Sequence, residues 1–197
     1  MLLGKVIQSN DHLDYLCQIY RGDEIEQPPE PLDFGVGQFV AIELPGGSQM
    51  VGVIYNTQLY NPDFGRLGPR LSPQNDLEIF SPDFLEERAM LVSIAALGTL
   101  NEQAQASQTP PIMTPEPDAL VHRLDDPEIR QFHLVEERFQ LAYAPRLLGN
   151  GHRSIPELLL TIIDRLRELF PDQAGLLALL QDDLLWRARV SPIGGEA

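Results

Sequence analysis

The sequence predicts an α+β fold, with an antiparallel β part first and a helical segment after it. Residues 1 to about 80 carry short apolar or alternating runs separated by Gly, Pro and Asp, a pattern typical of strands and turns. From residue 126 onward the apolar residues recur with a period near 3.6, which indicates amphipathic helices. The chain has 197 residues, of which 43% are apolar and 22% charged, so it can bury a sizeable core.

The β part should contain four strands, at residues 4–8, 14–20, 38–44 and 49–56. The third and fourth should form a hairpin, because Pro45 fixes φ and the glycines after it supply positive φ. An acidic loop precedes them at residues 22–31, and residues 77–80 are a candidate for a further short strand.

Two later segments are harder to assign. Residues 89–100 form an apolar run that periodicity alone cannot assign to a buried strand or a short helix. Residues 101–118 lack apolar periodicity, and their prolines remove amide donors, so we expect a loop there.

Three helices are predicted in the second part of the chain. The first starts at residue 126, with Asp125 or Asp126 as its N-cap and Pro127 in its first turn. Its apolar face comprises Ile129, Phe132, Val135, Phe139 and Ala142. Ser154 and Glu157 have the spacing of a capping box for the second helix. Asp172 can cap a third helix through Trp186, and residues 191–197 should be a disordered tail.

Several short motifs of the first 125 residues occur together in one known kind of domain. They are Gly4-Lys5-Val6-Ile7, Gly37–Glu43 before a glycine turn and Val51–Ile54, Leu91–Gly98, Pro110-Pro111 before Ala119–His122, and Asp125–Ile129. In this combination they resemble the HAS-barrel, a small barrel named for HerA helicases and ATP synthases. The resemblance implies a small N-terminal antiparallel β-barrel over residues 1–125, with a strand at residues 89–100, followed by a C-terminal α-helical segment over residues 126–190.

The chain differs from that family in the part that would carry the ATPase activity. In HerA-like proteins and ATP synthases the barrel precedes an ATPase domain with a Gly-x-x-x-x-Gly-Lys-Ser/Thr phosphate loop. No such motif is present, and Lys5 is the only lysine. What the resemblance implies is therefore a contact and assembly role without ATP hydrolysis, either alone or as an accessory subunit of such an ATPase.

A flavin-binding barrel is the other interpretation of the strand at residues 37–40. Gly37-Gln38-Phe39-Val40 also resembles the opening strand of ferredoxin-reductase-type barrels, which hold flavin with an Arg-x-Tyr-Ser/Thr segment. This chain has no such segment. We therefore expect Phe39 and Val40 to be core residues, and no cofactor.

Metal and nucleophile sites are weakly indicated. His12, His122, His133 and His152 share no short spacing, and a set of His122, Asp125 and Asp126 is less favoured than a strand end followed by a helix cap. Cys17 should be a small buried hydrophobe. Ser48 lacks a nucleophile elbow, and Asp23–Glu26 has the composition of a solvated loop. No catalytic, cofactor-binding or metal-binding residue is predicted.

The segment from Leu176 to Trp186 carries leucine on more than one helical face. We favour a simply buried helix. The alternative is an exposed apolar strip for a partner or a second copy, with Trp186, Arg187 and Arg189 as anchor residues.

Charge and cysteine content restrict the classes of partner and the cellular compartment that we expect. The 29 acidic and 14 basic residues give a formal net charge of −15, which disfavours nucleic acid and anionic membranes as partners. No apolar run is long enough to cross a bilayer, and the N-terminus lacks a signal-peptide pattern. Cys17 is the only cysteine, so no intrachain disulfide can form. We expect a cytoplasmic, non-enzymatic protein that binds a protein partner, with a homo-oligomer left open.

Overall fold

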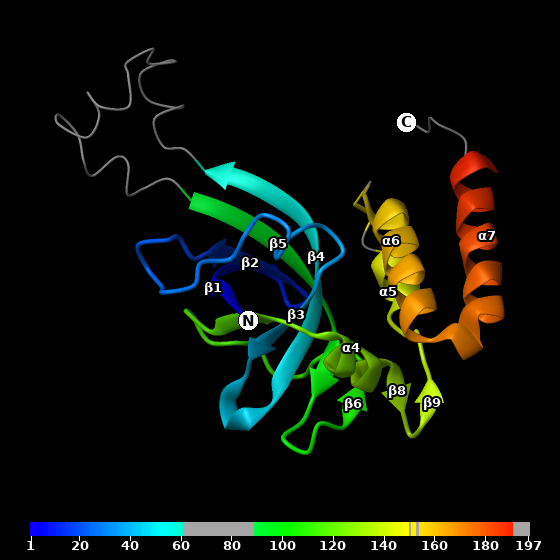
Figure 1. The fold of residues 1–197 in the computed structure, drawn as a ribbon, viewed down its shortest axis with the longest axis horizontal. Helices are drawn as coiled ribbons and strands as arrows, with labels where there is room; N and C mark the ends of the chain where they lie inside the picture. Colours follow the sequence, from blue (N-terminus) through cyan, green and yellow to red (C-terminus); the bar gives the residue numbers. More distant parts are fainter. Residues whose placement is uncertain (61–88, 150, 153, 191–197) are drawn as a thin grey trace, which may run out of the picture.

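The computed structural model describes residues 1–60, 89–149, 151, 152 and 154–190. It contains a β-barrel built from the N-terminal part of the chain and a group of helices on one side of that barrel (Figure 1). The α+β class predicted from the sequence is therefore confirmed. The candidate strand at residues 77–80 and the tail at residues 191–197 lie outside the described residues.

Six strands of the described chain close the barrel. They are β1 (Leu2–Asp11), β2 (Asp14–Ile19), β3 (Phe39–Glu43), β4 (Gln49–Tyr60), β5 (Ala89–Leu100) and β7 (Leu120–Arg123). All neighbours are antiparallel in the order β2-β1-β7-β3-β4-β5, and β2 pairs with β5 to complete the circle. A two-residue strand, β6 (Ala106–Ser107), adds to β5 inside the predicted loop. The ambiguous run at residues 89–100 is a strand.

The predicted hairpin joins β3 and β4, with Phe39 opposite Val53 and Glu43 opposite Gln49. Its turn is the 3-10 helix η1 (Pro45–Gly47), in which Gly46 and Gly47 have φ of 80° and 78°. Both conformations are in the left-handed region that glycine tolerates and other residues avoid. The turn chemistry expected from the sequence is confirmed.

The strands of one half of the barrel are buried on both faces. On β3, Val40 and Ile42 belong to the core inside the barrel, whereas Phe39 and Ala41 belong to a second core beneath the helices. The same alternation holds on β5, where Ile94 points inward and Leu97 outward. Burial on both faces requires apolar residues at successive positions, which explains the continuous apolar runs of these strands.

Strands β1 and β2 approach each other closely at a glycine. Gly4 lies opposite Ile19 and is buried. A Cβ atom added to it would lie 1.9 Å from the carbonyl oxygen of Gln18 and 2.8 Å from the carbon of the same carbonyl. Only glycine fits this contact, because the neighbouring atoms belong to a backbone that is itself held in the barrel.

Helix α4 (Asp126–His133) is capped more completely than expected. The Asp125 side chain accepts a hydrogen bond from the backbone N–H of Glu128 (2.9 Å), and the Glu128 carboxylate accepts one from the N–H of Asp125 (2.8 Å). These two bonds form a capping box, and Pro127 lies in the first turn as predicted.

The prediction that one helical face continues from Ile129 to Ala142 is wrong. The helix ends at His133, and a small hairpin of β8 (Leu134–Val135) and β9 (Arg138–Phe139) follows. Glu136 and Glu137 form its turn with φ of 51° and 64°. A short helix, α5 (Ala144–Gly149), completes the segment. The hairpin places Phe139 against His133, at a ring-centroid distance of 6.2 Å, and this packing outweighs the helical periodicity.

Helix α6 (Ile155–Leu169) starts where predicted, but not with the predicted cap. Ser154 has helical dihedral angles and makes no side-chain capping bond. Its hydroxyl lies 2.7 Å from Nδ1 of His152 and 3.4 Å from the carbonyl oxygen of Tyr55. The hydroxyl thus links the start of the helix to β4, and the expected capping box with Glu157 does not form.

The last helices form a hairpin on the barrel. α6 is followed by the 3-10 helix η2 (Pro171–Gln173) and by α7 (Ala174–Val190). α6 inserts seven residues into the second core: Ile155, Leu158, Leu159, Ile162, Ile163, Leu166 and Leu169. α7 lies on the far side of α6 from the barrel (Figure 1). No helix in the described ranges is long and apolar enough to cross a membrane.

Candidate functional site

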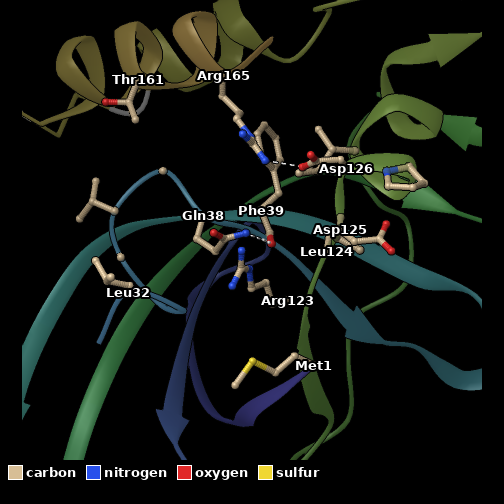
Figure 2. A pocket seen from close by; sticks show the side chains of 15 residues that line it. Met1, Leu32, Gln38, Phe39, Arg123, Leu124, Asp125, Asp126, Thr161 and Arg165 are labelled. Carbon is tan, nitrogen blue, oxygen red and sulfur yellow. Dashed lines mark hydrogen bonds and ion pairs between the residues drawn. The ribbon is translucent and has the colours of Figure 1, made fainter. Parts of the chain in front are cut away.

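A groove of about 770 Å³ lies where the end of the barrel meets α6. It is lined by the loop at residues 32–39, by residues 123–129, and by Thr161 and Arg165 of α6. Figure 2 shows Thr161 and Arg165 on the helix at one side, with Gln38, Phe39 and Arg123 on the barrel opposite. Its volume is in the range of small-molecule binding sites. Whether it could bind a ligand or support a reaction therefore depends on its polar groups.

Both arginines that line this groove form ion pairs with carboxylates in it or beside it. Arg123 donates to Asp33 through Nη1 and Oδ1 at 2.6 Å, which ties the loop to the end of β7. Arg165 forms ion pairs with Asp126 and with Glu168, and thereby ties α6 to the start of α4 (Figure 2). Asp125 is engaged in the capping box described above. The groove is therefore a joint between barrel and helices, held by paired charges.

The four histidines lie apart and have separate roles. His12 Nε2 lies 2.6 Å from the carbonyl oxygen of Pro111, and His122 Nε2 lies 2.9 Å from Oε1 of Glu43. His152 is at the start of α6, and its ring packs on Tyr55 at 5.2 Å. Across the described residues, no group of three or more His, Cys, Asp or Glu side chains could hold a metal ion. The set of His122, Asp125 and Asp126 is not brought together as a site.

His133 is a buried ionisable group of the helical segment, with none of its surface exposed. Its Nδ1 is 2.7 Å from the carbonyl oxygen of Ile129 and must donate to it, so Nε2 accepts from the Tyr143 hydroxyl at 2.8 Å. Rings of Phe39, Phe132, Phe139 and Phe170 surround it. Burial lowers the pKa of His133 to about 4, so the ring is neutral at pH 7.

The aromatic group around His133 connects α4, the β8–β9 hairpin, Tyr143 just before α5, and the outer face of β3. No spacing in the sequence singles out this group, because its members come from elements that only the tertiary fold assembles. Both ring nitrogens of the imidazole are engaged inside the protein, so the ring contributes to the packing between these elements.

Cys17 lies inside the barrel with none of its surface exposed, as predicted. Burial raises the pKa of its thiol to about 12. A thiol reacts as the thiolate, and at pH 8 almost none is present.

We expect Cys17 in the native protein to resist a thiol-specific disulfide reagent at pH 8 and to react fully in denaturant. The release of the reagent's chromophore, followed over an hour, measures this. A native reaction as fast as that of a free cysteine peptide would show that the barrel opens easily or that the thiol is accessible.

The other residues considered as sites also have structural surroundings. Ser48 follows η1, and its carbonyl oxygen accepts from the N–H of Leu44 at 3.0 Å. In the acidic run, Glu24 accepts from the backbone N–H of Arg21 at 2.7 Å. Phe39 and Val40 are core residues, 1% and 0% exposed, as predicted.

The outer helix α7 has one buried and one exposed apolar side. Leu177 and Leu184 are buried in the second core. Leu176, Leu179 and Trp186 are exposed by 49%, 69% and 62%. Leu180 is at the edge of this group. The favoured prediction of a simply buried helix is wrong, because α7 packs on α6 on the far side from the barrel and leaves Leu176, Leu179 and Trp186 exposed.

Comparison with known proteins finds one family. The family model described as a domain of unknown function (DUF8166) matches residues 1–193, which includes both the barrel and the helices. No curated protein matches the chain.

Proposed function

The chain belongs to the DUF8166 family, and from its geometry we propose that it is a non-catalytic module for protein–protein interaction or assembly. The observation that carries the proposal is the apolar outer face of α7, formed by Leu176, Leu179, Leu180 and Trp186. Several large apolar side chains exposed on one helix of an acidic protein are typical of a surface that another macromolecule covers. We call these four residues the α7 face.

The rest of the described molecule is consistent with a rigid support for that face. The six strands are hydrogen-bonded on both sides, and the second core locks α6 onto the barrel. The groove of Figure 2 is held by paired charges and presents no nucleophile next to a base within its described lining. A rigid scaffold with an exposed apolar helix is suited to binding more than to turnover.

A narrower form of the proposal is an accessory subunit of a HerA-like or ATP-synthase-type ATPase. The closed six-strand barrel supports it, because a barrel of this kind is what the sequence resemblance implies. On this proposal the chain contacts the ATPase without hydrolysing ATP itself.

Capture from a native extract tests the interaction role. We expect the wild-type chain to retain a protein that the Leu179→Glu variant loses, because a carboxylate at the centre of the α7 face opposes burial. Ile112→Glu is the matched control, since Ile112 is 95% exposed in the proline-rich loop. Equal capture by all three chains would contradict a role for the α7 face.

Isothermal calorimetry tests the non-catalytic part of the proposal. Titration of ATP with magnesium into the purified chain should give no binding heat above dilution. Binding at micromolar or lower concentration, or phosphate release above the blank, would contradict it.

A further inference from the structure

Strand β4 continues beyond the strand that lies beside it. The pairing of β3 with β4 ends at Phe39 opposite Val53, and Ile54 makes the last backbone hydrogen bonds on that side, to the loop before β3. β4 goes on as Asn56–Tyr60, which pairs with residues 89–93 of β5 in unbroken register. We call these two paired segments the β4–β5 arm. Within the described part of the chain, the other edge of Asn56–Tyr60 has no strand beside it.

This free edge lacks the features that usually prevent strands from pairing. Natural proteins protect an edge with charged residues, proline or a bulge. β4 contains no charge and no proline over its twelve residues, and residues 89–93 of β5 contain none either, although 22% of the chain is charged. The register shift between Ile54 and Asn56 precedes the free edge, so the edge itself is regular. Leu59 and Tyr60 are 81% and 53% exposed on it.

The absence of charge makes the free edge suited to a second copy of the same chain. In a two-fold contact each strand meets itself in the reverse direction, so a charged residue near the axis would meet its own charge. With the axis at Gln58, Gln58 lies opposite Gln58 of the other copy, and Thr57 lies opposite Leu59. No like charges meet. The rest of the chain carries a formal net charge of −15, which opposes self-association through charged surface.

We propose that two copies of the chain pair through their β4–β5 arms, with Asn56–Tyr60 of one copy antiparallel to the same residues of the other. The pairing closes at two copies, because β5 is already paired with β2 from Leu91 to Ala95. In Figure 1 the arm, with the cyan end of β4 and the green start of β5, extends away from the helices. The dimer therefore leaves the α7 face open, and this inference goes beyond the proposed binding of a partner there.

The net charge predicts how this dimer responds to salt. Two copies of charge −15 repel each other, and salt screens that repulsion without weakening backbone hydrogen bonds between uncharged strands. Analytical ultracentrifugation of the full chain from about 1 to 500 µM covers the range of weak dimers. We expect a concentration-dependent dimer, whose dissociation constant falls at least about threefold between about 0.05 and 0.5 M sodium chloride.

Hydrogen exchange followed by mass spectrometry locates the contact. Edge-to-edge pairing buries backbone N–H groups that water reaches in the monomer. Peptides that contain Asn56–Tyr60 should therefore exchange more slowly at the highest protein concentration than at the lowest. Peptides from α6 and from the loop at residues 109–117 should exchange alike at both concentrations.

A pair of charge variants tests the two-fold symmetry. Gln58 is exposed, and its amide donates one long hydrogen bond of 3.5 Å to the Ser93 hydroxyl, so the fold tolerates its replacement. Gln58→Lys and Gln58→Glu each place like charges opposite one another, which should weaken the dimer about fivefold. Gln58→Lys lowers the net negative charge, so its loss of dimer cannot come from overall repulsion. An equal mixture of the two variants should dimerise at least as tightly as the wild type.

The matched control is Gln103→Lys, which makes the same charge change at an exposed glutamine in the loop before β6. It should dimerise like the wild type, or slightly more tightly. Circular dichroism and thermal unfolding of each variant confirm that it is folded.

Four results would overturn the inference. They are a monomer at every concentration, a dimer without slower exchange at Asn56–Tyr60, a dimer that Leu179→Glu abolishes, and a mixture of the two Gln58 variants that dimerises no better than either alone. None of them bears on partner capture by the α7 face. Capture that depends on Leu179 would leave the proposed function standing whichever result is found.

Discussion

A Gly4→Ala substitution should destabilise the protein by about 3 kcal/mol, the upper range for forcing an extra carbon into a packed interior. The new methyl carbon would lie 1.9 Å from the Gln18 carbonyl oxygen. Neither strand can move aside easily, because β1 is also paired with β7 and β2 is also paired with β5. For a chain of this length the midpoint of thermal unfolding should fall by about 10 °C.

The matched control is the same substitution in open space. A Cβ at Gly175, near the start of α7, would have no atom within 4 Å. Gly175→Ala should therefore leave stability unchanged or raise it by up to about 1 kcal/mol, through the higher helix propensity of alanine. Equal unfolding midpoints for Gly4→Ala and wild type would show that β1 and β2 are not held as described.

Mild acid should also destabilise the protein, through His133. The pKa of this buried imidazole is lowered to about 4, whereas an unfolded histidine has a pKa of about 6.5. The unfolded state therefore binds a proton that the folded state excludes. The stabilisation is complete above pH 6.5 and is lost as pH falls toward 4. The difference in pKa corresponds to about 3 kcal/mol in total, of which about 2 kcal/mol is lost by pH 5.

Urea unfolding at pH 7.5, 6.5 and 5, followed by circular dichroism, measures this loss. His133→Gln is the comparison, since an amide can replace parts of both hydrogen bonds but does not titrate. The variant should be less stable than the wild type at pH 7.5 and should lose less stability on going to pH 5. The same loss in both proteins would assign the acid sensitivity to carboxylates elsewhere.

Signals that are local in sequence predicted the strands well. The β3–β4 hairpin could be located because its turn needs glycine and its strands are bounded by proline and polar residues. The strand at residues 89–100 could not be assigned from periodicity, because Ile94 and Leu97 face two different cores. A buried strand that is covered on both faces loses the alternation that distinguishes a strand from a helix.

The helical segment was predicted less well, because tertiary contacts override local patterns there. Ile129, Phe132, Val135 and Phe139 have helical spacing, yet the chain reverses at Glu136 and Glu137 with positive φ. Nothing in the local sequence favours that conformation for glutamate. Ser154 and Glu157 match a capping box, but the serine hydroxyl is engaged by His152 and by the barrel.

The leucine pattern indicated α7 as a candidate interaction surface, but it did not decide whether both leucine stripes are buried. Leucines on two sides of α7 fit either complete burial or one stripe reserved for a partner. The choice depends on how many helices cover the barrel, and α6 with the aromatic group around His133 already does so. The ion pairs Arg123–Asp33 and Arg165–Asp126 beside the groove were not predicted either, because the two residues of each pair are far apart in sequence.

The place of β7 in the barrel has a consequence for synthesis. This strand lies between β1 and β3, and its pairing joins residues near 2 to residues near 122. While the protein is made from its N-terminus, β1 and β3 have no neighbour on that side until residue 123 has left the ribosome. Nascent chains shorter than this carry two unpaired strand edges that can associate with other chains. We therefore expect the barrel to close only after residue 123 has emerged, and translational pauses before residue 123 to be the steps most prone to aggregation.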